Sequence, residues 1–118
     1  PYSLNNKGMA LGNLGKYEEA IKCYDEVLEI DPKNAIVLNN KGYALQNLGK
    51  YEKAIVFYEK SLETEPNDET ALCNKGESLF KLKKFSEAQN VIKKVLELNP
   101  NDKEAKELLD KINKELSN

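Results

Sequence analysis

Asparagine recurs in this chain at a fixed interval of 34 residues, as Asn6, Asn40 and Asn74. A carboxamide carries both a hydrogen-bond donor and an acceptor, so it can pair with one peptide unit of an extended segment as a sheet edge does. Three carboxamides in register could therefore hold a strand through its backbone without reading its side chains. The alternative is that these asparagines serve local packing alone. The elements that carry them decide between the two.

The same interval governs residues that shape the backbone. Proline, glycine and alanine each recur with it, at Pro32, Pro66 and Pro100, at Gly8, Gly42 and Gly76, and at Ala20, Ala54 and Ala88. Residues 1–34 and 35–68 are identical at 19 of 34 positions, and residues 35–68 and 69–102 at 14. A period of this length is typical of units that cannot bury their own apolar face and must stack on their neighbours. The sequence therefore predicts a short solenoid, an architecture that usually presents a surface.

Within each unit the pattern indicates a helix, a turn and a second helix. In the middle unit, residues 35–48 place apolar side chains at helical steps, and Gly49 follows where a helix end favours a left-handed residue. A second helix is predicted from Tyr51 to Thr64, with Pro66 closing it and Asp68 capping the next helix. Helices of about 14 residues are too short to persist alone in water, so packing must stabilise them.

The end of the chain breaks the repeat but keeps helical spacing. In residues 103–118, apolar side chains form one stripe and Lys and Glu fill the rest. Such a helix can cover the last apolar face of a solenoid and offer water a polar one. We therefore predict one all-α domain, with helix-turn-helix units at 1–34, 35–68 and 69–102 and a C-terminal capping helix at 103–118.

Composition argues against several classes of function. The 118 residues carry a net charge of −2, which predicts neither a nucleic-acid nor a membrane partner. The chain has no histidine, and it lacks phosphate-loop and zinc-type spacings, so we predict no enzymatic activity, cofactor or metal. Cys23 and Cys73 stand at different places in their units and indicate no disulfide framework. This favours a cytoplasmic protein.

The chain resembles the tetratricopeptide repeat family. The residues that carry the resemblance in the middle unit are Leu38, Gly42, Leu45, Tyr51, Ala54, Tyr58, Leu62 and Pro66. The resemblance implies that Gly42 and Ala54 let the two helices approach closely. It also implies a right-handed superhelix whose first helices line a concave groove. One departure is Lys83, which replaces the turn glycine and is expected to adopt a left-handed conformation at a cost of about 1 kcal/mol.

The face of each first helix opposite its packing residues is predicted to line the groove. The predicted peptide-binding residues are Asn5, Asn6, Asn39, Asn40, Asn74, Tyr2, Met9, Ile36, Tyr43, Thr70 and Phe80. The resemblance supports a role for the asparagines, since some family members grip an extended peptide with asparagines at the equivalent place. Aromatic and Met side chains on an exposed concave face are typical anchors. The alternative for Phe80 is that it packs against the capping helix.

A narrower family function is not expected. Members that bind chaperone C-termini hold the terminal carboxylate with Lys and Asn in the first repeat, Asn in the second, and Lys and Arg in the third. The corresponding residues here are Asn5, Met9, Asn40, Thr70 and Asn74. Only Asn40 matches, and charge-assisted pairing to a carboxylate needs the missing cations.

The sequence thus predicts a protein-interaction scaffold that binds an extended or helical peptide segment of a partner in its groove. The alternative is a structural fragment of a longer array, which stacks or self-associates through its exposed N-terminal face. The sequence does not identify the partner.

Overall fold

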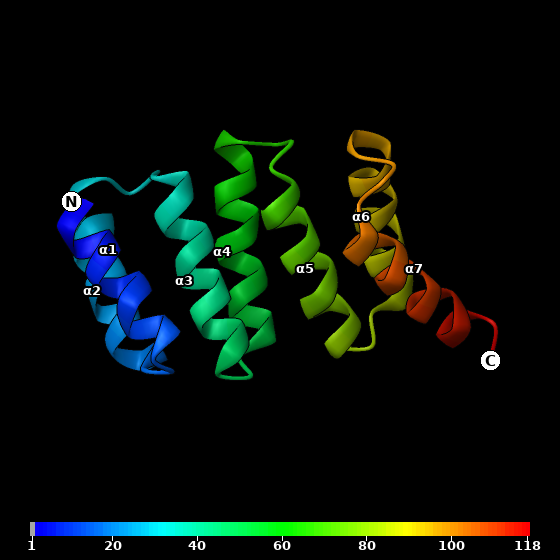
Figure 1. Cartoon of the computed structure of the whole chain (residues 1–118), viewed down its shortest axis with the longest axis horizontal. Helices are drawn as coiled ribbons and strands as arrows, with labels where there is room; N and C mark the ends of the chain where they lie inside the picture. Colours follow the sequence, from blue (N-terminus) through cyan, green and yellow to red (C-terminus); the bar gives the residue numbers. More distant parts are fainter. Residues whose placement is uncertain (1) are drawn as a thin grey trace.

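The computed structural model describes residues 2–118, without the side chain of Tyr2, so the predicted role of Tyr2 lies outside the described residues. Within this range the chain forms seven helices and measures 44 × 25 × 21 Å. They are α1 (Tyr2–Asn13), α2 (Tyr17–Ile30), α3 (Ala35–Asn47), α4 (Tyr51–Thr64), α5 (Glu69–Lys81), α6 (Phe85–Leu98) and α7 (Lys103–Leu116). Figure 1 shows them following one another along the long axis, with the two termini at opposite ends.

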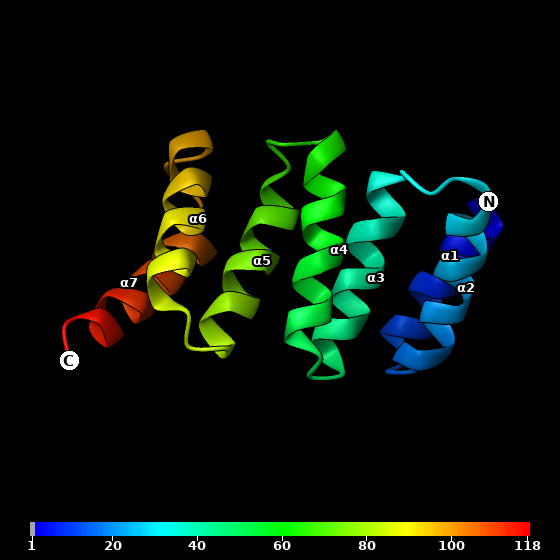
Figure 2. The same ribbon diagram turned by 180° about the vertical axis from the view of Figure 1, so that it is seen from behind.

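The helices form two layers. Each helix packs on its neighbours in the sequence, and in addition α1 contacts α3, α3 contacts α5 and α5 contacts α7. No comparable contact joins two even-numbered helices within the described residues. The odd-numbered helices therefore approach one another more closely and form the concave layer, while the even-numbered helices form the outer layer that lies nearer the viewer in Figure 2. This confirms the predicted all-α solenoid.

The predicted helix ends are confirmed. The side chains of Asn34, Asp68 and Asp102 accept hydrogen bonds from backbone N–H groups in the first turns of α3, α5 and α7. Gly49 has a φ of 79°, in the left-handed region that favours glycine. Lys83 takes the same conformation with a φ of 63°. It therefore carries the strain that the sequence predicts.

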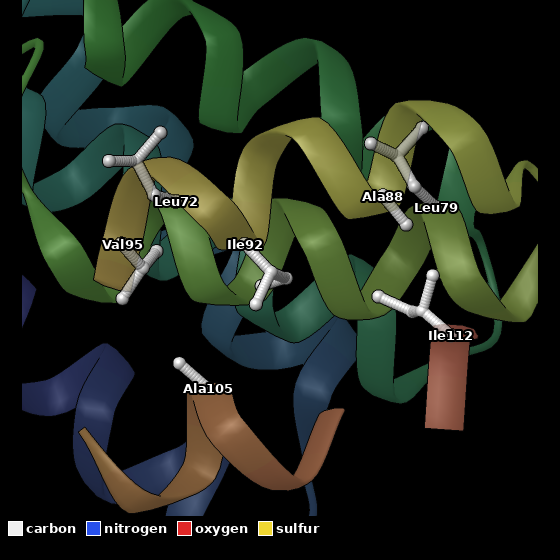
Figure 3. Packing of buried hydrophobic residues seen from close by; sticks show 7 residues of the cluster. All are labelled: Leu72, Leu79, Ala88, Ile92, Val95, Ala105 and Ile112. Atoms are coloured by element: carbon white, nitrogen blue, oxygen red, sulfur yellow. The ribbon is translucent and has the colours of Figure 1, made fainter. Parts of the chain in front are cut away.

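The capping role of α7 is also confirmed. Ala105 and Ile112 of α7 are buried against side chains of α5 and α6 (Figure 3). The partners that Figure 3 labels are Leu72, Leu79, Ala88, Ile92 and Val95. Most of the remaining α7 residues are exposed. The helix thus closes the apolar face of the third helix pair and presents a polar face to solvent, as a terminal repeat must.

A glycine on each first helix sets the distance to its second helix. A Cβ atom added at Gly42 would lie 2.7 Å from Cε1 of Tyr58 and 2.8 Å from Cδ1. Tyr58 is fully buried, so its ring has no room to retreat. The close approach predicted at Gly42 is confirmed, and the ring that occupies the space belongs to the same helix pair.

We expect Gly42→Ala to lower the free energy of unfolding by about 1–3 kcal/mol, because the methyl group overpacks the Tyr58 ring. Gly12→Ala is the matched control in α1, where an added Cβ meets nothing within 4 Å. That change should raise stability by about 0.5–1 kcal/mol through helix propensity alone. Urea unfolding followed by circular dichroism measures both. Equal effects of the two substitutions would contradict the packing argument.

Candidate peptide-binding groove

The concave layer exposes large side chains on its N-terminal half. Met9 of α1 is 46% exposed and Tyr43 of α3 is 51% exposed, and both line one pocket between these helices. Ile36 is 68% exposed but lies at the start of α3, in a separate hollow with Pro66 and Asn67. The structure therefore brings Met9 and Tyr43 together and leaves Ile36 apart from them. Exposed aromatic and Met side chains of this kind suit binding rather than the core.

The asparagines of neighbouring repeats meet in one place. Nδ2 of Asn40 donates a hydrogen bond of 3.1 Å to Oδ1 of Asn5. The partner of Asn40 in the first repeat is thus Asn5, while Asn6 is exposed. One repeat further on, the equivalent residues are Asn74 and Asn39, but no such bond forms. Instead, Oδ1 of Asn39 is buried without a hydrogen-bond partner among the described residues.

The C-terminal half of the concave layer has a different character. A pocket of about 260 Å³ lies between α5 and α7, where Cys73, Asn74 and Phe80 line it together with charged groups. The charged residues are Glu77, Lys81, Glu104, Glu107 and Lys111. Three carboxylates therefore face two ammonium groups, and this end of the groove is polar and slightly acidic.

Two predicted residues of the third repeat take part in local structure. Phe80 is partly buried and its ring meets that of Phe85 edge to face, with centroids 5.5 Å apart. This contact holds Phe80 at the apolar cluster beneath the capping helix, while part of its side chain lines the α5–α7 pocket. Thr70 is exposed in the first turn of α5, where its backbone N–H donates to the Asp68 carboxylate.

Cys73 lies in the same pocket as a free thiol. Burial raises the pKa of Cys73 to about 11, and the carboxylates of Asp102 and Glu104 add to this shift. The thiol is consequently protonated near neutral pH and behaves as a small apolar group.

A polar bridge inside the second helix pair was not predicted from the sequence. Gln46 Oε1 accepts a hydrogen bond of 2.6 Å from the Tyr58 hydroxyl and one of 3.0 Å from Ser78 Oγ. It links α3, α4 and α5, so it joins the second helix pair to the third. The sequence signal for this bridge is Gln46 itself. Its equivalents are Gly12 and Phe80, so this position of the repeat holds a different residue type in each unit.

The three repeats identify the protein family. The tetratricopeptide repeat model matches residues 1–34, 35–68 and 70–102. The chain belongs to the tetratricopeptide repeat family. The curated proteins contain no significant match to this domain.

Solved structures similar to this tetratricopeptide repeat domain include peptide complexes. One is the first repeat domain of Spaghetti (RPAP3) bound to the HSP90 peptide SRMEEVD, with 32% identity, 99% of this chain and 93% of that chain covered, and a TM-score of 0.96. Another is the second repeat domain of human RPAP3 in complex with the HSP70 peptide SGPTIEEVD, with 30% identity, coverage of 95% and 93%, and a TM-score of 0.90. The first domain of human RPAP3 is 33% identical with a TM-score of 0.92, covering 97% of this chain and 90% of that one.

We expect Tyr58→Phe to lower the free energy of unfolding by about 1 kcal/mol, because the change removes the bond from the hydroxyl to Gln46. Tyr24→Phe is the matched control at the equivalent place in the first repeat. The Tyr24 hydroxyl makes no hydrogen bond within the described residues, so its loss should change stability by less than about 0.5 kcal/mol. Urea unfolding of the two variants tests this, and comparable losses would contradict it.

We expect Cys73 to react slowly with iodoacetamide at pH 8. A pKa of about 11 instead of the ordinary 9.0 makes the thiolate fraction about a hundredfold smaller, and the thiolate is the reacting species. Peptide mapping by mass spectrometry after timed alkylation follows Cys73 separately from Cys23. The control is the same reaction in guanidinium chloride, where both thiols should react at similar, faster rates. Rapid labelling of Cys73 in the folded protein would show that the thiol is not desolvated.

Proposed function

We propose that this domain holds an extended peptide segment of a partner protein in its concave groove. The observation that carries the proposal is the carboxamide pair Asn40–Asn5, which sits on the concave layer beside the exposed Tyr43 and Met9. The paired asparagines retain hydrogen-bonding capacity toward a peptide backbone, and the two larger side chains offer contact area. In this proposal the chain acts as a single binding domain, made of the units 1–34, 35–68, 69–102 and 103–118.

The unpaired carboxamide oxygen of Asn39 supports the proposal. It stands one repeat further along the groove than the Asn40–Asn5 pair, without a donor. A buried acceptor without a partner costs free energy that a donor can recover. Asn74 holds the place in the period that Asn40 holds one repeat earlier, so its amide is the proposed donor to this oxygen in a second carboxamide pair. The proposed ladder is therefore built from pairs across repeats rather than from one asparagine per repeat.

The charges argue against an acidic tail as the ligand. The similar domains of RPAP3 bind peptides that end in EEVD. In this chain the residues at the clamp positions, Asn5, Met9, Asn40, Thr70 and Asn74, are all uncharged. The charged residues that line the α5–α7 pocket comprise three carboxylates and two ammonium groups. An acidic terminus at the clamp positions would thus lose hydration without a cation beside it, and the lysines of the α5–α7 pocket are outnumbered by carboxylates. We propose an uncharged or weakly basic segment instead.

The test begins with selection of a random twelve-residue peptide library on the immobilised domain. The affinities of the selected peptides for the wild-type domain, Asn40→Ala and Asn90→Ala are then measured by fluorescence polarisation. Asn40→Ala should weaken binding about tenfold, because it removes a carboxamide from the groove. Asn90→Ala, an exposed asparagine of α6 in the outer layer, is the matched control and should change nothing. The peptide SRMEEVD should bind more weakly than the selected peptides.

Two results would contradict this function. One is equal binding by Asn40→Ala and Asn90→Ala when circular dichroism shows both to be folded. The other is tight binding of SRMEEVD, because the clamp positions carry no cation and the two lysines of the α5–α7 pocket face three carboxylates. The alternative of self-association through the N-terminal face is measured by mass at increasing concentration, where a monomer would argue against it. A cytoplasmic location stays a prediction of the sequence; no helix within residues 2–118 is long and apolar enough to cross a membrane.

A further inference from the structure

One position of the repeat is filled in three different ways along the groove. It lies where the first helix of a pair meets its second helix and the first helix of the next pair. The three equivalent sets are Gly12, Tyr24 and Ala44; Gln46, Tyr58 and Ser78; and Phe80, Ile92 and Ile112. In the second set a carboxamide joins two hydroxyl groups, and in the third the side chains are apolar. In the first set the place of the glutamine is empty, because Gly12 has no side chain.

The empty place is an open pocket of about 260 Å³. Its lining residues come from three helices: Met9, Gly12 and Asn13 of α1, Tyr17 and Tyr24 of α2, and Asn40, Tyr43 and Ala44 of α3. A Cβ atom added at Gly12 would meet nothing within 4 Å. No charged residue lines the pocket among the residues that the structure describes.

The Tyr24 hydroxyl has no acceptor from the described residues at this pocket. Tyr24 is only 4% exposed as a residue, but its hydroxyl oxygen is not among the buried atoms left without a partner, so solvent reaches it through the open pocket. Its ring lies against Gly8 as the ring of Tyr58 lies against Gly42, with Cε1, Cδ1 and Cζ the nearest atoms in both cases. The two hydroxyls therefore occupy equivalent places, and only that of Tyr58 has the acceptor that Gln46 supplies. Burial raises the pKa of Tyr24, so the hydroxyl keeps its proton and remains a donor.

We propose that this pocket is a subsite for a glutamine side chain of the bound peptide, whose carboxamide oxygen accepts from the Tyr24 hydroxyl as Gln46 accepts from Tyr58. This rests on the proposed function. A glutamine of the ligand would occupy the space that the chain fills with its own glutamine one repeat later. Asn13 and Asn40 offer carboxamide oxygens to the ligand's NH₂ group.

The absence of charge in the lining selects glutamine over glutamate. A carboxylate entering the pocket would be removed from water without a cation to pair with, which costs more than burying a neutral amide. An apolar side chain would fill the space but exclude the solvent that reaches the hydroxyl in the free domain, and so leave it without an acceptor. The subsite therefore recognises one polar, uncharged side chain of the peptide, and the groove binds the rest of the segment through its backbone.

A double-mutant cycle tests the pocket without any peptide. Gly12→Gln supplies the carboxamide from the chain itself, and Gly12→Met supplies a side chain of similar length without an acceptor. Tyr24→Phe should lower the urea midpoint in the Gly12→Gln protein and leave it unchanged in the wild-type and Gly12→Met proteins. An unchanged midpoint in all three backgrounds would show that a glutamine in this place does not reach the hydroxyl, and would overturn the proposal.

Peptide selection tests the ligand. The probe is a library of capped peptides in which each position in turn is fixed as Gln, Glu, Asn or Leu. The wild-type domain should enrich Gln over Glu and Leu at one position. Gly12→Gln should abolish that preference, Tyr24→Phe should weaken binding of the Gln peptide about threefold to tenfold, and Tyr58→Phe should leave it unchanged.

The outcomes separate this subsite from the groove function. Peptides that bind the wild-type domain and lose affinity in Asn40→Ala, but show no preference for Gln, would overturn the subsite and leave the groove function standing. A Gln preference that survives Gly12→Gln would also overturn the subsite. If the wild-type domain enriches no peptide, the proposed function fails and the ligand of this pocket with it.

Discussion

The structure depends on the contact between a glycine of each first helix and a large side chain of its second helix. Gly8 meets Tyr24, Gly42 meets Tyr58 and Gly76 meets Ile92, each closely enough that a Cβ atom would lie 2.5–2.7 Å from the neighbour. This contact brings the two helices of a pair together and leaves the opposite face of the first helix free of packing. Since helices of this length are unstable alone, the same contact both stabilises the fold and determines which side chains reach the groove.

Repetition of the backbone allows the side chains at one junction to vary. The glycine contact recurs in all three pairs, but the side chain beside it is absent at Gly12, polar at Gln46 and aromatic at Phe80. The first choice leaves a pocket, the second a hydrogen-bonded bridge and the third an apolar plug beneath α7. A repeat architecture tolerates this variation because each junction contacts only its neighbours. The groove is consequently open and uncharged at its N-terminal end and charged at its C-terminal end.

Most of the fold could be predicted from the sequence, because its signals are local. The left-handed Lys83 and the Asp68 cap follow from single positions at a known place in the period. The site was harder to predict, because it depends on contacts between repeats. Helical periodicity placed Asn6 and Asn40 at equivalent positions, but the hydrogen bond that forms joins Asn40 to Asn5. The reason is that a contact between repeats depends on how the two helices are offset, and the period does not determine this offset. The pocket at Gly12 could not be predicted from the period, because it arises where a side chain present at the equivalent positions, Gln46 and Phe80, is missing.

The distribution of charge supports the proposal that this domain takes a ligand different from the acidic peptides of its structural relatives. A carboxylate ligand is held by cationic side chains, which lose hydration when it binds. A site for such a ligand therefore needs Lys or Arg at defined positions, and these residues can be recognised in the sequence. Here the carboxamides of Asn5 and Asn40 occupy that region and share one hydrogen bond, which leaves each with further hydrogen-bonding capacity. In the proposed function, such a groove gains little from a charged end group, because the clamp positions carry no cation to offset the lost hydration. It gains more from a peptide backbone, whose alternating donors and acceptors match those of a carboxamide. The residue types that we expect to disfavour a charged terminus are therefore the same ones that favour an internal, extended segment.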